Sequence, residues 1–446
     1  MHKYEIKYYN NSSVYGEMLY KKDWFVFLDS CFDINNSGKY DIISCDPYIK
    51  ITSYGKNVTV ENENLVSSFY DNPIDIIKKY YSSSDSNNSI PFKNGIIGYF
   101  GYDALQNTDI SSNLFPDIAV GFYDWAIIVD HSIKKSWITY KKINPFINSL
   151  LKKINQDSLT VSFDSNYSFS NFIQNTKKDK YIKDVKRIKS YIDNGDCYQV
   201  NYSQNFESSF EGQPWDIYKD VRKINPAPYS AFLKINDRYV ISSSPERFIS
   251  VVKNKVETKP IKGTLKRLGD PVLDKKQIKI LANDEKNLSE NLMIVDLLRN
   301  DISKCCELFS VKVNKLFDIE SFTSVHHMVS TISGKLNKNI SSIDILTACF
   351  PGGSITGAPK KRSMEIIDEL ENRKRQVYCG SIGYFDENNN MDTNICIRTI
   401  MLHKNKLFFA AGGGIVHDSD PLDEYNESLE KVSVFLKFFS NGIFKW

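Results

Sequence analysis

Three charged residues near the end of the chain could act together on a substrate. Glu424, Glu427 and Lys431 follow the spacing i, i+3 and i+7, which places their side chains on one face of a helix. Such a set is most often a solvated helix surface with a salt bridge. Three glycines at 412–414 precede this helix, and glycines let the backbone approach a ligand closely. The glycines favour a binding role, and the salt-bridge interpretation remains the alternative.

A further carboxylate, Glu290, begins an otherwise apolar segment that predicts a helix at about 289–299. Glu290 could simply complement the helix dipole. If this helix and the C-terminal helix meet, Glu290 and Glu427 could instead hold Mg²⁺, which prefers one or two carboxylates together with water and substrate oxygens. The sequence alone does not establish that the two helices meet.

The segment Pro351–Lys360 is rich in glycine and carries two hydroxyl side chains. It is not a P-loop, because Ala358 and Pro359 stand where lysine and a hydroxyl residue should follow the last glycine. Its backbone N–H groups lead into a predicted helix at 362–370, an arrangement that suits a bound carboxylate. A plain glycine-rich turn is the alternative.

Arg398 is predicted to lie on a strand at 393–400, on the same face as Asn394 and Cys396. A guanidinium in this apolar context needs an anionic partner. That partner is either the carboxylate of a ligand or an internal acidic side chain.

Lys262 and His327 are two further candidates for chemistry. Lys262 lies between a proline, Pro260, and a glycine, Gly263. In such a segment an exposed turn lysine is the usual case. A nucleophilic lysine there requires desolvation or neighbouring positive charge to deliver a free amine near neutral pH. His327 alternates with apolar residues, which is more often the pattern of a core histidine with satisfied hydrogen bonds.

The elements that must position these residues include both strands and helices. Apolar runs and alternation predict strands at 24–28, 42–44, 96–99, 126–129, 198–204, 393–400 and 407–411. Helical spacing predicts helices at 185–192, ending at Gly195, and at about 289–299, 362–370 and 422–439. Helices and strands without regular βαβ alternation indicate an α+β fold.

Two polar stretches interrupt this pattern. Ser82–Ser89 contains serine and asparagine without core residues and is predicted to be an exposed loop. The stretch between about 144 and 180 is polar and irregular. We therefore expect two regions, 1–165 and 166–446, with no internal repeat.

The bulk composition restricts the class of protein. The 446 residues are 41% hydrophobic and 25% charged, as in average globular proteins, and the net charge of +3 gives no support for nucleic acid or an anionic membrane as the main partner. Eight irregularly spaced cysteines are poor material for disulfides or a zinc site. Residues 1–9 lack the apolar core of a signal peptide, and no run is long enough for a spanning helix. We expect a cytoplasmic protein.

Several long motifs occur in a fixed order. They are Ser244-Pro245-Glu246-Arg247-Phe248, the segment Glu290–Asp301, the turn Gly353–Lys360, and Ala411–Asp420 followed by Glu424–Glu427. Together they resemble the chorismate-utilising enzymes, a family that includes anthranilate synthase component I, aminodeoxychorismate synthase component I, and isochorismate and salicylate synthases. The resemblance covers most of the chain and is densest over 191–431. It implies an α+β fold of large antiparallel sheets packed together and flanked by helices.

Within this family, two positions resemble the aminodeoxychorismate synthases. Lys262 stands where anthranilate synthases typically carry alanine. Gln199 stands where isochorismate and salicylate synthases carry a water-activating lysine. The resemblance implies a transferase that aminates chorismate at C4 and gives 4-amino-4-deoxychorismate for p-aminobenzoate and folate synthesis. The alternatives are anthranilate synthase component I, which aminates C2 and releases pyruvate, and a non-catalytic chorismate-binding subunit.

The resemblance also implies residue roles. Glu290 and Glu427 would hold Mg²⁺ as cofactor, with Glu424 orienting water on the ion. Lys262 would add covalently at C2, and His327 would act as general acid on the departing C4 hydroxyl. The expected substrate-binding residues are Gln199, Ser354, Ile355, Thr356, Gly357, Tyr378, Arg398, Gly413 and Lys431.

Two further expectations concern partners and ligands. The chain has no convincing glutaminase nucleophile elbow, so a separate class I glutamine amidotransferase subunit is expected to supply ammonia. Ser30, Pro228 and Tyr229 lie in segments that resemble the parts that hold tryptophan in relatives. Buried packing is the alternative for these three residues.

Overall fold

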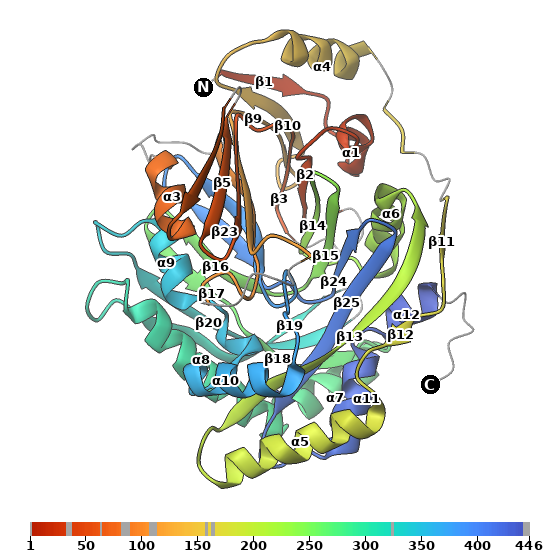
Figure 1. Cartoon of the computed structure of the whole chain (residues 1–446), viewed down its shortest axis with the longest axis vertical. Helices are drawn as coiled ribbons and strands as arrows, with labels where there is room; N and C mark the ends of the chain where they lie inside the picture. Colours follow the sequence, from red (N-terminus) through yellow and green to blue (C-terminus); the bar gives the residue numbers. More distant parts are fainter. Residues whose placement is uncertain are drawn as a thin grey trace.

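The computed structural model of the chain describes residues 2–32, 38–62, 65–81, 90–106, 114–156, 159–161, 166–322 and 325–439. Within these residues the chain forms two large antiparallel sheets flanked by helices (Figure 1). The predicted α+β class with packed antiparallel sheets is therefore confirmed. The predicted loop at Ser82–Ser89 lies outside the described residues.

The first sheet has 13 strands among the described residues. In spatial order they are β1 (His2–Ile6), β10 (Lys135–Tyr140), β9 (Trp125–Asp130), β3 (Tyr40–Ser44), β2 (Val26–Asp29), β14 (Tyr229–Ile235), β15 (Arg238–Ser244), β24 (Thr399–His403), β25 (Lys406–Ile415), β13 (Gln199–Gly212) and β11 (Tyr167–Phe169). The short strands β12 (Ile173–Gln174) and β21 (Gly357–Ala358) also pair with β13.

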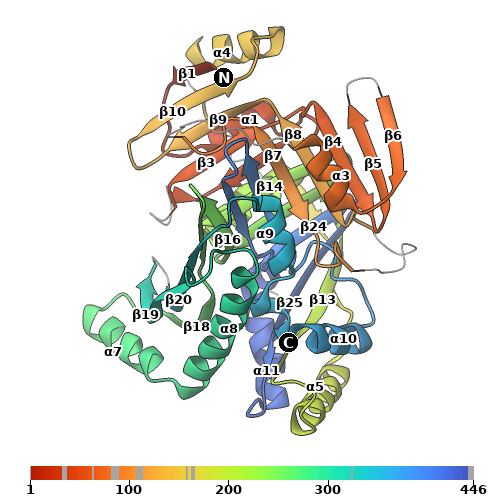
Figure 2. The same cartoon turned by 90° about the vertical axis from the view of Figure 1, so that its left-hand side faces the viewer.

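The second sheet has 12 strands in the same described part of the chain. Their order is β18 (Ile261–Lys266), β20 (Val325–Lys335), β17 (Lys255–Thr258), β16 (Arg247–Val252), β23 (Met391–Asn394), β22 (Ser381–Asp386), β7 (Gly95–Phe100), β8 (Ile118–Tyr123), β4 (Ile49–Tyr54), β5 (Asn57–Asn62) and β6 (Leu65–Tyr70). Strand β19 (Lys312–Ser321) pairs with β20, and the hairpin β5–β6 forms the opposite edge (Figure 2).

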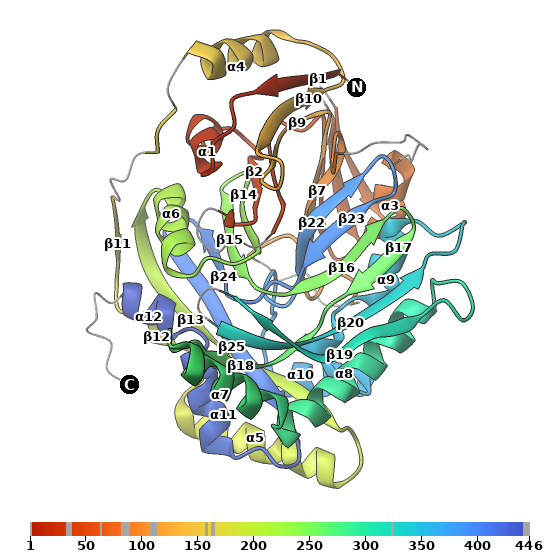
Figure 3. The same ribbon diagram turned by 180° about the vertical axis from the view of Figure 1, so that it is seen from behind.

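Most helices pack on the outer side of the first sheet, and others contribute side chains to the core between the two sheets. They are α1 (Ser13–Leu19), α3 (Pro73–Tyr80), α4 (Pro145–Gln156), α5 (Lys178–Asp193), α6 (Pro214–Ile224), α7 (Pro271–Ala282), α8 (Glu285–Ser303), α9 (Ser342–Cys349), α10 (Lys360–Glu371), α11 (Pro421–Glu430) and α12 (Ser433–Phe439), with a 3-10 turn η1 (Gly353–Ile355). Helices α7 and α8 pack beside strands β18–β20 (Figure 3), and α11 packs against α5 and β25. None of the described helices has the length and apolar content needed to cross a membrane.

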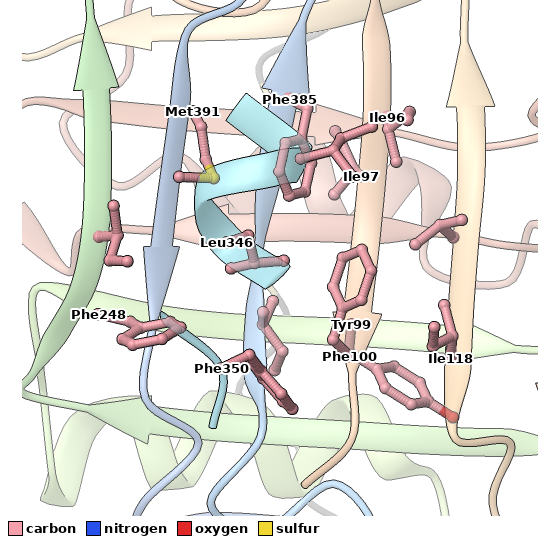
Figure 4. Packing of buried hydrophobic residues seen from close by; sticks show 14 of the residues in the cluster. Ile96, Ile97, Tyr99, Phe100, Ile118, Phe248, Leu346, Phe350, Phe385 and Met391 are labelled. Atoms are coloured by element: carbon pink, nitrogen blue, oxygen red, sulfur yellow. The ribbon is translucent and has the colours of Figure 1, made fainter. Parts of the chain in front are cut away.

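Two apolar cores arise because the central strands of the first sheet are buried on both faces. Along β2, Val26 belongs to the core between the two sheets, whereas its neighbour Phe27 belongs to the core between the first sheet and the helices. Ile42 and Ile43 on β3 divide in the same way, as strand alternation requires. In the core between the sheets, α9 packs its Leu346 against strands β7, β22 and β23 (Figure 4).

Most predicted elements are present, with different lengths. The strands predicted at 24–28, 42–44, 96–99 and 126–129 overlap β2, β3, β7 and β9, and the helix predicted to end at Gly195 is α5. The N–H groups of Gly195 and Asp196 donate to the carbonyls of Ile192 and Tyr191, and Gly195 has φ +81°, so a glycine cap ends the helix. The strands predicted at 198–204 and 407–411 extend to 212 and 415.

Two predicted elements are wrong in detail. The strand predicted at 393–400 is two strands, β23 and β24, which belong to different sheets. The helix predicted at 422–439 is divided into α11 and α12 by a turn at Lys431 and Val432. Strands from 1–165 and from 166–446 occur in both sheets, and the boundary between these regions stays a prediction.

Candidate functional site

The chain crosses between the two sheets twice at one place. Strand β15 of the first sheet leads through Glu246 into β16 of the second, and β23 of the second returns through Arg398 to β24 of the first. The crossings are joined by backbone hydrogen bonds: the Ile395 N–H donates to the Glu246 carbonyl (3.0 Å) and the Ser243 N–H to the Arg398 carbonyl (3.0 Å). These bonds hold the backbone of Glu246 and of Arg398 in one structural unit.

Arg398 does not lie on a strand, and its predicted face shared with Asn394 and Cys396 is wrong. The chain leaves the second sheet after Asn394 and joins the first at Thr399, and Arg398 has φ +51° in between. Its Nη1 donates to Asn225 Oδ1 over 3.4 Å, and burial lowers the pKa of Arg398. Within the described residues Arg398 forms no ion pair with a carboxylate, so a substrate anion can take that place.

Lys262 points toward α8 because its strand is irregular. The pairing of β18 with β20 shifts register between Ile261 and Thr264, as in a β-bulge. Gly263 within this irregularity has φ +78°, and an added Cβ would lie 2.8 Å from a side chain of α7. The Lys262 ammonium lies 3.4 Å from the carboxylate of Glu290 on α8.

Glu246 is a buried acid beside Lys262 that the sequence-based interpretation did not assign to the site. Burial raises the pKa of Glu246 to about 7, although a hydrogen bond from Ser354, the charge of Lys262 and the Ile261 backbone act in the opposite direction. Its side chain is 6% exposed. The one signal in the sequence is an acid directly before the apolar strand β16. At neutral pH this carboxyl is therefore protonated in part and can donate or accept a proton.

Lys286 joins the two acidic helices, whose meeting the sequence left open. The Lys286 ammonium on α8 lies 3.1 Å from Glu424 on α11. Burial alone would lower the pKa of Lys286, but Glu424, together with Glu290 and Glu427, raises it. Three carboxylates from two helices therefore act electrostatically on one ammonium.

The glycine run forms one wall of this region. Gly413 lies inside β25, which extends beyond the strand predicted at 407–411. A Cβ added at Gly413 would lie 3.1 Å from Glu424, 3.3 Å from the Lys431 ammonium and 3.8 Å from Glu427. The Lys431 ammonium pairs with Glu427 (2.8 Å) and lowers its pKa. A side chain at 413 would thus fill the space between the charged groups.

This donor set suits a magnesium ion only in part. Glu290 and Glu427 supply the two carboxylates that Mg²⁺ typically uses, and both face a region closed by Lys286 and Gly413. Among the residues that the structure describes, no three acidic, histidine or cysteine side chains are close enough together to share one ion. The remaining positions of an ion would have to be filled by water and by substrate oxygens, as is usual for Mg²⁺.

The predicted cradle at 354–357 lies against the first residues of β13. Ser354 and Ile355 belong to η1, and Gly357 pairs with Val200 through β21. Gly357 has φ +142°, and an added Cβ would lie 2.0 Å from the Gln199 carbonyl, so only glycine fits there. The Thr356 carbonyl accepts the Asn201 N–H (2.7 Å).

Gln199 lies beside Lys262 at Gly414, and Tyr378 lies in a turn joined to the chain before Arg398. Gln199 is fully buried, yet neither its amide oxygen nor its amide nitrogen has a partner among the described residues. Its amide nitrogen and the Lys262 ammonium lie 2.5 Å and 3.4 Å from the position of a Cβ on Gly414. Tyr378 lies in a turn that hydrogen-bonds to the chain just before Arg398, since the Cys379 N–H donates to the Cys396 carbonyl (2.9 Å).

His327 lies on β20 near Lys262 but is a weak candidate for a proton donor. Burial, and then the positive charge of Arg398, lower the pKa of His327 to about 4. Its Nδ1 lies 2.8 Å from the Thr264 hydroxyl. The imidazole is therefore neutral at pH 7, whereas the Glu246 carboxyl, with its pKa raised to about 7 by burial, still carries a proton in part at that pH.

The residues of the candidate tryptophan site line a separate cavity of about 760 Å³. Ser30, Pro228 and Tyr229 form part of its wall. Charged side chains of both signs, Arg247 and Asp392, also line the cavity, and the Arg247 guanidinium lies 5.3 Å from the centre of the Tyr229 ring. A cavity lined by apolar and aromatic surface and by charges of both signs suits an amphipathic ligand. The identity of that ligand stays a prediction.

Comparisons with known proteins agree with this geometry. The model of the chorismate binding enzyme family matches residues 29–437. The aminodeoxychorismate synthase component 1 of Escherichia coli is 39% identical over 437 residues, covering 93% of each chain. The anthranilate synthase component 1 of Lactococcus lactis is 34% identical over 433 residues, covering 92% of this chain and 94% of the relative.

Solved structures have the same fold. Anthranilate synthase component I from Streptococcus pneumoniae superposes with a TM-score of 0.80 at 30% identity, over 89% of this chain and 92% of the other. The menaquinone-specific isochorismate synthase of Escherichia coli superposes with a TM-score of 0.74 over 98% and 94% of the two chains. Its 14% identity supports the fold alone.

Proposed function

Because this chain belongs to the family of chorismate-binding enzymes, we propose that it aminates chorismate at C4 to give 4-amino-4-deoxychorismate. This product lies on the route to p-aminobenzoate and folate. The observation that carries the proposal is the position of Lys262, which lies 3.4 Å from Glu290 and close enough to the buried acid Glu246 to lower its pKa. The name of the Escherichia coli relative supports the same assignment.

The charges in the site suit a dianionic substrate. Arg398 is buried without an acidic partner among the described residues, so a carboxylate of chorismate would remove the cost of its isolated charge. The backbone of Ser354–Gly357 and the ammonium of Lys431 would hold the second carboxylate and the ring. Tyr378 and the backbone at Gly413 would limit how the ring can lie.

Lys262 would act as the nucleophile, and Glu246 would act as the proton donor. The Lys262 ammonium gives a proton to Glu290, its amine forms a bond to C2, the two ring double bonds shift, and the C4–O bond breaks as Glu246 donates its proton to the leaving hydroxyl. Ammonia then forms a bond to C4, the double bonds shift back, and the amine of Lys262 leaves C2 and regains the proton from Glu290. The new C4 ammonium returns a proton to Glu246. The products are 4-amino-4-deoxychorismate and water, and the enolpyruvyl group is retained.

Glu290 and Glu427 would hold Mg²⁺ beside this reaction, with Glu424 next to them. When bound, the ion would supply positive charge that offsets these carboxylates and holds the ring carboxylate of chorismate. Lys286, which pairs with Glu424, would keep the third acid turned toward the same region.

Ammonia would come from a separate class I glutamine amidotransferase subunit. The relatives named "component 1" support the idea of a second component. We also propose tryptophan as the ligand of the cavity lined by Ser30, Pro228 and Tyr229, because its wall carries aromatic surface and charges of both signs.

Anthranilate synthesis is the second candidate, and the 34% identical relative from Lactococcus lactis favours it. Product analysis separates the two. The purified chain is incubated with chorismate, Mg²⁺ and an ammonium salt, and the products are identified by chromatography and a pyruvate assay. The proposal requires aminodeoxychorismate without pyruvate, whereas anthranilate with pyruvate would contradict C4 amination.

A further inference from the structure

Arg375 is a buried arginine next to the site, and the proposed chemistry does not use it. The residue is 1% exposed. Its Nε and Nη2 donate to the two carboxylate oxygens of Glu371, over 3.1 Å and 2.6 Å. A buried ion pair of this kind contributes little net stability compared with well-packed apolar residues. The function of the Arg375–Glu371 ion pair therefore lies in the groups that it orients.

The remaining donors of Arg375 hold two backbone carbonyls of the candidate site. Its Nη1 donates to the Ile355 carbonyl (2.9 Å) and its Nη2 to the Asn201 carbonyl (2.7 Å). In a trans peptide the N–H of the next residue points away from the carbonyl. By holding the Ile355 carbonyl, Arg375 keeps an acceptor oxygen away from a bound anion and fixes the peptide that leads into Thr356, whose N–H donates to the Gly353 carbonyl (3.4 Å) and closes the 3-10 turn.

Glu371 holds the same strand at a second point. Its Oε1 accepts hydrogen bonds from the N–H (2.9 Å) and the hydroxyl (2.8 Å) of Ser203. On the neighbouring strand β25, Asn201 pairs with Gly414 and Ser203 pairs with Gly412. The two attachments of the ion pair to β13 therefore lie on either side of the position that faces Gly413.

A third part of the site is attached through the backbone of Arg375. Its carbonyl accepts the N–H of Tyr378 (3.1 Å), which fixes the turn that carries this tyrosine. On the other side, the Tyr102 ring lies 4.7 Å from the guanidinium, which provides a cation–π contact. The guanidinium is thus fixed from several directions and cannot move without moving the cradle.

We propose that Arg375, with Glu371, is the positioning residue of the chorismate site: it sets the cradle at Ile355, strand β13 opposite the glycine run, and the turn of Tyr378 in register with one another. The inference rests on the proposed function for the identity of the ligand. Arg375 does not touch the substrate; it determines where the groups that bind the substrate lie.

The test measures chorismate binding without ammonia, so that no amination is needed for the readout. In Arg375→Lys the charge remains, but an ammonium cannot bond Glu371 on two sides and reach both carbonyls. We expect the Kd for chorismate, from calorimetric titration with Mg²⁺ present, to rise at least 10-fold. In steady-state assays the KM for chorismate should rise similarly, while the KM for ammonium changes less than twofold.

Arg222→Lys is the matched control. Arg222 is 4% exposed and donates to Asp29 of β2 over 2.7 Å, so it is also a buried arginine in an ion pair. We expect Arg222→Lys to lower the Tm while leaving the Kd for chorismate within twofold of wild type. If both variants lower the Tm and neither changes the Kd, Arg375 has only a structural role and the proposal is overturned.

A second variant decides the matter if Arg375→Lys does not fold. Glu371→Gln keeps an acceptor for Ser203 but removes the charge and one acceptor from Arg375. A Kd for chorismate raised at least threefold supports positioning, and an unchanged Kd overturns it. A wild-type chain that binds chorismate but forms no aminodeoxychorismate would remove the proposed function and leave this binding test readable.

Discussion

The Nζ atom of Lys262 lies 3.4 Å from Oε2 of Glu290, and both side chains are nearly buried, at 13% and 11% exposure. This ion pair joins a bulged strand of the second sheet to the helix that carries one of the two proposed magnesium ligands. It places the candidate nucleophile next to the acids, and among the residues that the structure describes no further hydrogen bond of its ammonium holds it in a purely structural role. Covalent catalysis by Lys262 follows as the central claim.

Replacing Lys262 by alanine should abolish most amination at C4. The reaction loses its nucleophile, so kcat/KM should fall by more than about 10³-fold while chorismate binding persists. Rates of aminodeoxychorismate formation, measured by chromatography, test this. Lys266→Ala is the control, because Lys266 is exposed on the same strand and should behave as wild type. Near-normal amination by Lys262→Ala would refute the covalent mechanism.

Glu246 should give the enzyme an alkaline limb in its pH profile. Its carboxyl donates a proton only below its pKa of about 7, so kcat/KM should decline as the pH rises through 7. Glu246→Gln cannot donate in this way and should lower the plateau about 10²-fold and remove the decline. An unchanged alkaline limb in this variant would assign the proton to another group.

The same residue should affect stability with a defined sign. Burial raises the pKa of Glu246 from 4.5 to about 7, so the folded state binds the proton more tightly than the unfolded state. The associated stability is present below pH 4.5 and is lost as the pH rises to about 7. At pH 8 Glu246→Gln should therefore be more stable than wild type, by up to about 3 kcal/mol. Urea unfolding at pH 5 and pH 8 measures the difference.

Replacing Arg398 should raise the stability of the protein and weaken substrate binding. Arg398→Met removes a buried charge that has no acidic partner among the described residues, so its Tm should rise. The same change removes a carboxylate ligand and should raise the KM for chorismate about 100-fold. Arg238→Met is the control, because Arg238 begins β15, the strand next to β24, and is hydrogen-bonded to Asp237. This variant should leave the KM for chorismate unchanged. A normal KM in Arg398→Met would place the substrate carboxylates elsewhere.

Magnesium dependence should follow the two acidic helices. Chelation by EDTA should abolish amination, and added Mg²⁺ should restore it. Glu427→Gln should raise the Mg²⁺ concentration for half-maximal activity at least about 10-fold, since it removes one of two carboxylate ligands. Glu430→Gln is the control, because Glu430 lies exposed on the same helix. Calorimetric titration of Mg²⁺ into the chain with chorismate gives the same comparison without turnover.

The sequence predicts the parts of this protein that depend on local patterns. Apolar runs identify β2, β3, β7 and β9, whose residues are mostly buried on both faces. Helical spacing identifies α5 and α10, and Gly195 gives a clear signal for the end of α5. The face shared by Glu424, Glu427 and Lys431 is likewise a property of one helix, and the structure places all three beside Gly413.

The parts that depend on long-range arrangement could not be predicted in this way. Alternation through 393–400 suggested one strand, because a local pattern does not reveal that the chain changes sheets at Arg398. Glu246 reads as an ordinary acid in the sequence, and its raised pKa depends on burial by segments distant in the chain. The same holds for Arg375, whose partners come from β13, η1 and the loop after β7.

The most direct test of the central claim is the intact mass of the chain after incubation with chorismate and Mg²⁺ in the absence of ammonia. Covalent catalysis predicts a fraction of wild-type chain heavier by the mass of chorismate less one water, with the modification mapped to Lys262 by peptide analysis. The added mass should disappear when an ammonium salt is supplied and should be absent from Lys262→Ala. An enzyme that forms aminodeoxychorismate but never carries this mass, or carries it on another residue, would contradict the role assigned to Lys262.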